Sequence, residues 1–227
     1  MGFSRYAIPA PGLVRTGEER ATLVRRTYSL VFASVLITTI GTWFGISQPS
    51  VMQAVAAHPI ITMLCAFAPL IMAQRARASF PQNIGLVFLF TFVMGVSISP
   101  LVFVMERMQP GVVTQAGVLT LSTFGVLTLY AWFSRRDFSA WGGFFIVGLW
   151  VLIGTSLLNL FFQNQSVALW IAGGTVLVFS GLLIFDTWRL RNVYGPEDYV
   201  LAAVNIYLDL LNMFMAILQL LGGGRRQ

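Results

Sequence analysis

The sequence has no lysine, a single histidine and a single cysteine, and only 10% of its 227 residues are charged. One cysteine cannot close a disulfide within the chain, and His58 and Cys65 alone cannot build a zinc site. A soluble domain carries far more charge on its surface. These shortages exclude a disulfide-stapled fold, a zinc protein and an ordinary soluble domain. Cys65 lies inside an apolar segment, where we expect it to pack as a small hydrophobic residue.

Apolar residues dominate the chain, which is 57% hydrophobic and has a mean hydropathy of +0.79. Apolar runs recur along it, each close to the roughly 20 residues that a bilayer-spanning helix needs. They cover about 27–47, 58–74, 84–105, 111–133, 141–162, 167–188 and 200–221. Short polar connections separate them, several with proline or glycine. We therefore predict an all-α integral membrane protein, a seven-transmembrane-helix bundle.

The polar flanks divide the chain into three parts. Residues 1–26 form a charged arm that leads into the first helix, residues 27–221 form the membrane domain, and residues 222–227 form a short basic tail. The connections inside 27–221 are too short to hold a further domain. We expect the bilayer to be the main partner of this chain.

The arginines predict the orientation of the bundle. Of the fourteen arginines, eleven lie in the arm and in the second, fourth and sixth connections, whereas the third connection carries only Arg107. Positive charge collects in cytoplasmic loops, so the N-terminal arm is expected in the cytoplasm. Arg225 and Arg226 in the tail conflict with seven full crossings, yet we expect the last segment to cross rather than re-enter. Basic clusters interleaved with aromatics are absent, so no nucleic-acid partner is expected.

Two carboxylates, Asp186 and Asp209, interrupt the apolar sequence of residues 182–221. An aspartate near the centre of a bilayer costs roughly 2.5 to 3.5 kcal/mol, so it usually faces a protein interior or a water path and usually has a function. Asp186 lies about 8 Å from the cytoplasmic end of its helix, taken at Arg191, and Asp209 has a similar depth if its helix begins near Ala203. Two carboxylates in contact share a proton, because both cannot ionise cheaply. The sequence thus predicts a pH sensor, or else an Asp186 that merely pairs with Arg189.

Polar residues in the last segment follow a helical spacing. Asn205, Asp209, Asn212 and Gln219 share one stripe, whereas the other faces are apolar. Lipid cannot solvate such a stripe, so the last helix is expected at the centre of the bundle, with the stripe along a polar pathway. The alternative for the amides is that they join helices by hydrogen bonds.

Arginines at the end of the second apolar segment face the same side of the membrane. Arg75 and Arg77 set the orientation if they only reach toward water. One of them can instead reach the aspartates and act as a latch that protonation releases.

Enzyme signatures are missing from the sequence, which lacks HExxH, GxSxG and a phosphate-binding glycine-rich loop. Two intramembrane aspartates leave open an intramembrane aspartyl protease, but the sequences around Asp186 and Asp209 differ from those of such enzymes. We expect no enzyme activity and no cofactor.

Three stretches carry a family resemblance: FDTWRL at 185–190, EDYVLAAVNIYLDLLNMF at 197–214, and GVSISP at 95–100 together with QAGVLTLSTFG at 115–125. The chain resembles the bacterial branch of the Bax inhibitor-1 family, also called the transmembrane Bax inhibitor motif or lifeguard family, over about 27–221. Phe185 replaces the usual tyrosine before the first aspartate. The resemblance implies a seven-helix bundle with the last helix central, surrounded by the other six, in a bacterial plasma membrane.

The resemblance also implies a pH-sensitive calcium leak controlled by an aspartate pair, which corresponds to Asp186 and Asp209. A basic residue at the cytoplasmic end of the second helix latches the pair, and Arg75 matches it by position. Calcium would be the transported ion, bound transiently at the pair, although two carboxylates fall short of its usual six to eight ligands. Some bacterial relatives instead resemble partners of a membrane-bound AAA+ protease, so a modulator that transports nothing, with a protease or stress-survival partner, is the alternative hypothesis.

Overall fold

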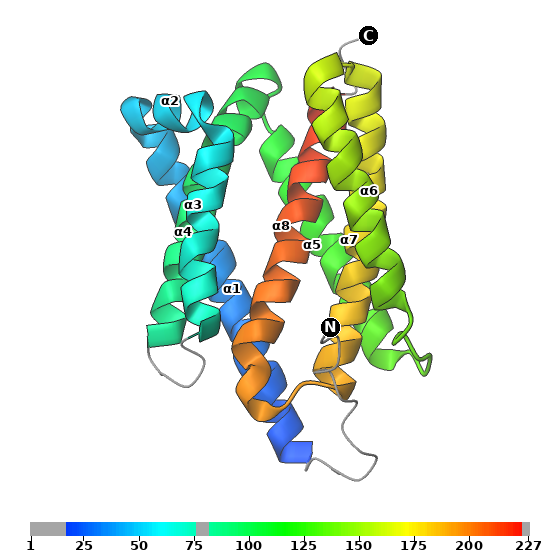
Figure 1. Ribbon diagram of the computed structural model, residues 1–227. Helices are drawn as coiled ribbons and strands as arrows, with labels where there is room; N and C mark the ends of the chain where they lie inside the picture. Colours follow the sequence, from blue (N-terminus) through cyan, green and yellow to red (C-terminus); the bar gives the residue numbers. More distant parts are fainter. Residues whose placement is uncertain (1–16, 76–81, 224–227) are drawn as a thin grey trace, which may run out of the picture.

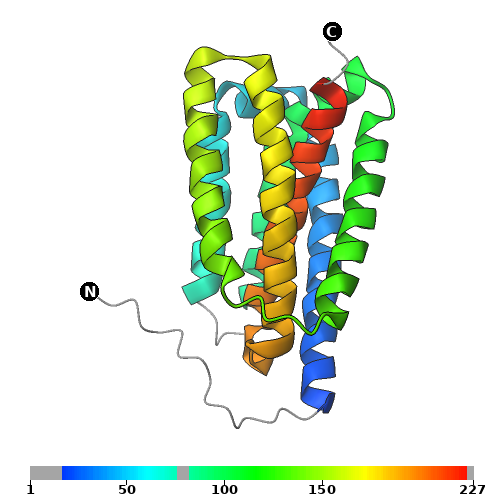
Figure 2. The same cartoon turned by 90° about the vertical axis from the view of Figure 1, so that its right-hand side faces the viewer.

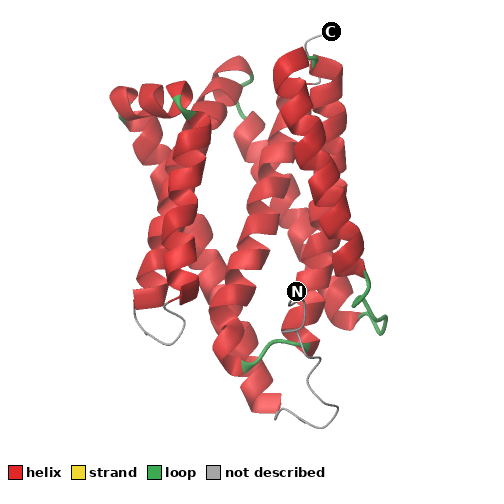
Figure 3. Ribbon diagram, viewed as in Figure 1, coloured by secondary structure: helices red, strands yellow, loops and turns green. Residues whose placement is uncertain are grey.

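The computed structural model describes residues 17–75 and 82–223, and these residues form helices joined by short connections, without a strand (Figure 3). The elements in chain order are α1 (Gly17–Ser47), α2 (Pro49–Ala57), α3 (Pro59–Arg75), α4 (Gln82–Met108), α5 (Val112–Phe133), α6 (Trp141–Phe162), α7 (Gln165–Asn192), the 3-10 helix η1 (Pro196–Asp198) and α8 (Tyr199–Gly223). The all-α prediction is confirmed. Residues 1–16, 76–81 and 224–227, which include Arg77 and most of the basic tail, lie outside the described part.

Within the described ranges, six helices are long and apolar enough to cross a membrane, and α2 with α3 makes a possible seventh span. The seven-helix prediction is therefore confirmed if the bent pair counts as one span. The sequence missed α2 as a separate helix. It meets α3 at an angle of 101° because Pro59 follows His58, whose backbone (φ −132°, ψ 57°) is not helical.

Helix α8 lies at the centre of the bundle (Figures 1 and 2). It packs against α1, α4, α5 and α7, while α3 packs on α4 and α6 packs on α7. A larger share of its residues is buried than in any other described span. The central position predicted for this helix is confirmed, but α3 and α6 form an outer layer beside α4 and α7, so the six other spans do not all pack directly on α8.

Helices α1 and α4 approach each other closely because small residues line their contact. A Cβ atom added to Gly41 would collide with the backbone of Phe92, and one added to Gly95 would collide with the backbone of Thr38. Membrane helices commonly pack in this way, since small side chains let their backbones come together. Gly95 begins the GVSISP stretch, so close helix packing accounts for this motif.

Helix α8 begins at the end of the bundle where α1 begins, and it ends at the opposite end (Figure 1). It therefore runs the full length of the bundle instead of re-entering. Cys65 is exposed on α3, so the prediction that it packs in the interior is wrong. In a membrane this thiol faces the lipid.

Candidate functional site

Two buried carboxylates on neighbouring central helices form the candidate site. Asp186 lies on α7 and is 6% exposed, and Asp209 lies on α8 and is 4% exposed. The two helices pack directly against each other. The fold therefore brings the two aspartates onto adjacent helices.

The last segment, predicted at about 200–221, begins within one residue of that position, which is earlier than the start near Ala203 on which the similar depth of the two aspartates depended. The 3-10 turn after Pro196 leads directly into α8, which begins at Tyr199. At 1.5 Å per residue, Asp209 lies about 15 Å along α8, whereas Asp186 lies about 9 Å from the end of α7. The distances of the two aspartates from the ends of their helices therefore differ by about one helical turn.

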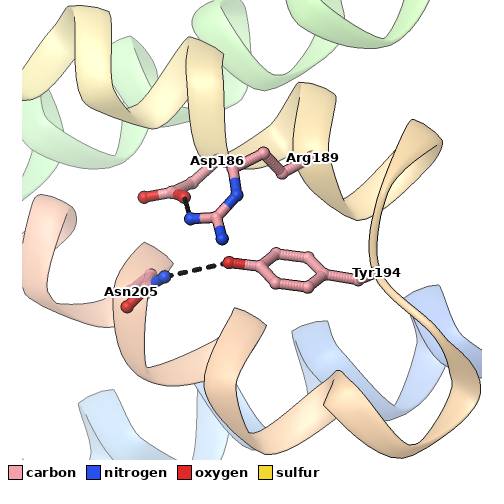
Figure 4. Close-up of polar contacts among 4 residues, drawn as sticks. All are labelled: Asp186, Arg189, Tyr194 and Asn205. Atoms are coloured by element: carbon pink, nitrogen blue, oxygen red, sulfur yellow. Dashed lines mark hydrogen bonds and ion pairs between the residues drawn. The ribbon is translucent and has the colours of Figure 1, made fainter. Parts of the chain in front are cut away.

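Asp186 has a counter-ion on its own helix. A guanidinium nitrogen of Arg189 donates to the Oδ1 atom of Asp186 over 3.1 Å (Figure 4). The guanidinium carbon lies over two aromatic rings, 4.6 Å from the ring centre of Tyr194 and 5.4 Å from that of Phe185, so both rings attract this cation. The alternative in which Asp186 pairs with Arg189 is the arrangement observed.

Tyr194 completes the site from the connection between α7 and α8. The Nδ2 atom of Asn205 donates to its hydroxyl oxygen over 3.0 Å, and Figure 4 shows Asn205 facing Asp186 from α8. Burial, together with the nearby Asp186 carboxylate, raises the pKa of the Tyr194 hydroxyl well above its usual range. Tyr194 therefore stays a neutral phenol at physiological pH. Sequence reasoning missed this residue because it belongs to a break between helices rather than to a helical pattern.

Asp209 has no such support. Its Oδ2 atom is buried and makes no hydrogen bond with any residue of the described ranges. A buried charge without a partner is costly, and in proteins such a group takes up a proton or lies against a cation. The two aspartates therefore differ in their partners. Asp186 forms an ion pair with Arg189, whereas the Oδ2 atom of Asp209 has no hydrogen bond to the described residues.

The three amides of the predicted polar stripe differ in whether they reach the site. Asn205 reaches the site, whereas the amide of Asn212 donates to the Leu208 carbonyl oxygen of its own helix over 2.8 Å. Gln219 is half-buried near the far end of α8. The predicted pathway along all three amides stays a prediction.

The latch assigned to Arg75 stays a prediction as well. Arg75 is the last residue of α3, and its side chain lies outside what the structure describes. The described residues contain no group of three or more histidine, cysteine, aspartate or glutamate side chains that could hold a metal ion. Calcium at Asp186 and Asp209 would therefore need backbone carbonyl groups and water to complete its shell.

A small cavity lies beside the start of α8. Its volume is about 20 Å³, enough for one water molecule, and it is lined by ends of α3 and α4, by η1 and by the first turns of α8. Asn83, Glu197 and Asp198 supply its polar and acidic groups. This end of α8 is the one nearer to Asp209.

Comparison with known proteins places the chain in a family. A family model described as "Inhibitor of apoptosis-promoting Bax1" matches residues 20–226. The chain is 31% identical to "Bax inhibitor 1" of Schizosaccharomyces pombe over 208 residues, which are 89% of this chain and 77% of that protein. It is 31% identical to "Protein lifeguard 4" of Mus musculus over 205 residues, 89% of this chain and 85% of that protein. An uncharacterised protein of Helicobacter pylori is 31% identical over 222 residues, 96% of this chain and 94% of the other.

The match covers every spanning helix and includes both aspartates, and the fold and composition are those of an integral membrane protein. The chain therefore belongs to the Bax inhibitor-1, or lifeguard, family of membrane proteins.

Proposed function

We propose that this protein is a pH-sensitive cation leak channel, with calcium as the preferred ion and with Asp186 and Asp209 as sensor and ion site. The observation that carries the proposal is the buried Oδ2 atom of Asp209 on the central helix, which makes no hydrogen bond with the described residues, together with Asp186 on the adjacent helix α7. Evolution rarely keeps a group this costly in a membrane protein unless it serves a pathway or a switch.

In this proposal, the channel opens or closes according to how the negative charge of Asp186 and Asp209 is neutralised. At neutral pH, Arg189 holds Asp186, and the remaining charge attracts a proton, a cation or a basic side chain such as Arg75. Acid protonates the pair, weakens its hold on Arg75 and releases α3 from the start of α8. The expected direction is therefore more leak at acid pH than at alkaline pH.

The water-sized cavity beside the start of α8 supports a route for the cation on this side. Glu197 and Asp198 give it a negative lining that attracts cations. The cavity is too small for a hydrated ion, so it corresponds to a closed form that widens when α3 and α8 separate. Carbonyl groups and water complete the calcium shell that two carboxylates begin.

The test is a flux measurement with purified protein in liposomes that contain a calcium-sensitive dye. The wild type is expected to leak in a pH-dependent way, and Asp209→Asn is expected to flatten the pH profile. Asp137→Asn is the matched control, because it makes the same change at an exposed carboxylate outside both the pair and the cavity, and it should leave the shape of the profile unchanged. If Asp209→Asn leaks with the same pH profile as the wild type, Asp209 is not the pH sensor.

The latch is tested separately in the same assay. Arg75→Ala is expected to raise the resting leak at neutral pH, because the pair loses the side chain that holds α3 against α8. A resting leak equal to that of the wild type contradicts the role of Arg75 but leaves the aspartate pair in place.

A second candidate is a membrane modulator that transports nothing and acts on a membrane-bound AAA+ protease or another stress-survival partner. It is favoured by the family description, which names inhibition of apoptosis rather than transport. This reading places the activity in the N-terminal arm. Deleting residues 1–20 leaves a leak intact but removes a contact with such a partner, so the deletion distinguishes the two functions.

A further inference from the structure

A large apolar groove lies on the other side of α8 from the aspartate pair. Its volume is about 450 Å³, and its walls come from α1, α4 and α5, with α8 as the floor. The floor residues are Tyr207, Leu210, Leu211 and Phe214. At 3.6 residues per turn, these residues point roughly opposite to Asp209, so the groove is separate from the proposed ion site.

The groove lies at membrane depth and opens beside lipid-facing surface. On α1 it runs from Val35 to Ile46, about 16 Å at 1.5 Å per residue, which is close to half of the roughly 30 Å hydrocarbon core of a bilayer. Trp43 lines its outer part and is 69% exposed, one turn before α1 ends, a position typical of aromatic residues at the membrane surface. The groove is therefore continuous with the interface that the protein makes with one leaflet.

The polar groups along the groove are already satisfied by the protein. Thr38 donates to backbone oxygens of Ser34 and Thr91, and its hydroxyl contacts that of Tyr207 at 2.7 Å. The three other threonines that line it also donate to backbone carbonyl oxygens: Thr39 to Val35, Thr42 to Thr38 and Gly95, and Thr120 to Ala116.

Water that entered the groove would find few free partners there, whereas a hydrocarbon chain needs none. An empty space of this size would forfeit the dispersion contacts of its walls. From its position, length and satisfied lining, we propose that the groove binds one acyl chain of a membrane lipid, which enters from the leaflet nearer the α4–α5 connection.

Gly117 offers a way to close the groove. It lines the groove from α5, and a Cβ atom added to it meets no atom within 4 Å. Gly117→Phe therefore puts a ring into the groove without a clash at Cβ. Gly125 is the matched control, because it is also a half-buried glycine on α5 with open space at Cβ, and it does not line the groove.

The experiment uses the full chain in vesicles of a phospholipid with a photoreactive group on its acyl chain, followed by peptide mapping. We expect label on Tyr207, Leu210, Leu211 and Phe214, the α8 residues that line the groove. Gly117→Phe should reduce this label at least tenfold, whereas Gly125→Phe should keep it, and the label on exposed Leu36 and Ile40 of α1 should not change in either.

Three results overturn the proposal. The first is label on Leu36 and Ile40 without label on α8. The second is α8 label that survives Gly117→Phe. The third is a dimer, trapped in a parallel sample with a bifunctional protein cross-linker, that Gly117→Phe abolishes, because the groove would then hold a second protomer. If Gly117→Phe does not fold, Gly117→Leu gives the same readout with a smaller side chain.

Discussion

Asp186 and Asp209 show how differently two similar residues can be held at the same site. Asp186 bonds to Arg189, three residues along the same helix, whereas Asp209 has a buried oxygen without a hydrogen bond to the described residues. Removing either carboxylate therefore has a different consequence. Loss of Asp186 leaves the Arg189 cation without its partner, whereas loss of Asp209 removes a buried carboxyl oxygen that has no hydrogen bond to the described residues.

Breaking the Asp186–Arg189 ion pair is expected to lower the stability of the protein by an amount that depends on pH. Arg189→Gln leaves a buried carboxylate without its counter-ion, which we expect to destabilise the protein by about 3 kcal/mol at neutral pH. The cost should shrink in acid, because protonation removes the stranded charge. Thermal unfolding of the detergent-solubilised protein measures it.

The double variant Asp186→Asn with Arg189→Gln is the control for this pair. It should recover most of the lost Tm, since neither charge is then left alone. A double variant no more stable than Arg189→Gln, or a loss that does not vary with pH, would show that the arginine acts through packing on Tyr194 and Phe185 instead.

The raised pKa of Tyr194 leads to a second pH effect, a loss of folding stability at high pH. Its raised pKa means that, above about pH 10, the unfolded chain loses this proton while the folded chain keeps it. The folded state then binds more protons, so stability falls as pH rises. Tyr194→Phe removes this decline, but it also removes the bond from Asn205, at a cost of about 1 kcal/mol.

The expected result is a variant that is less stable than the wild type near pH 8, with a gap that narrows as the pH rises above 10. Unfolding temperatures across this range measure it. A gap of constant size would mean that Tyr194 ionises in the folded protein as it does in water.

At the scale of helices, the start of α5 depends on a side chain from the preceding helix. The two carboxylate oxygens of Glu106, in the last turn of α4, accept from the backbone nitrogens of Gly111 (2.7 Å) and Val113 (3.2 Å). These nitrogens have no partner within their own helix, and a negative charge is favourable at a helix N-terminus. Glu106 therefore fixes the connection between α4 and α5.

Glu106→Ala is expected to lower stability by about 1 kcal/mol, because two backbone donors lose their acceptor. Glu106→Gln should fall between Ala and the wild type, since it keeps one acceptor oxygen without the charge. The Tm of the three proteins gives the order. Equal values for Ala and the wild type would mean that water replaces the carboxylate at no cost.

At the scale of the molecule, the bundle has two distinct ends, because α1 and α8 begin at the same end and α8 finishes at the other (Figure 1). We predict that the end where α1 begins faces the cytoplasm of a bacterial cell, from the arginines of the second, fourth and sixth connections. Alkaline phosphatase fused after residue 136 should be inactive, and the same enzyme fused after residue 163 should be active. The reverse pattern would invert the bundle and place the aspartate pair near the outer surface.

The spanning helices could be predicted from the sequence because length and hydropathy are local properties. The segments 111–133 and 141–162 match α5 and α6 within one residue at each end. The predicted segment 200–221 likewise begins within one residue of α8, although the short helix η1 that precedes it was not predicted. Helix α2 was missed because its nine residues are too few to span a membrane.

The sequence by itself determined that two aspartates lie within membrane-spanning helices and that a polar stripe requires the last helix to be central, because apolar surroundings penalise these residues wherever the helices pack. Only the tertiary structure decided that Arg189, close to two aromatic rings, is the cation at Asp186, that the Oδ2 atom of Asp209 is left without a hydrogen bond among the described residues, and that an apolar groove lies on the other side of α8. The physical reason is that partners and cavities depend on how helices distant in sequence meet, which a one-dimensional pattern does not contain.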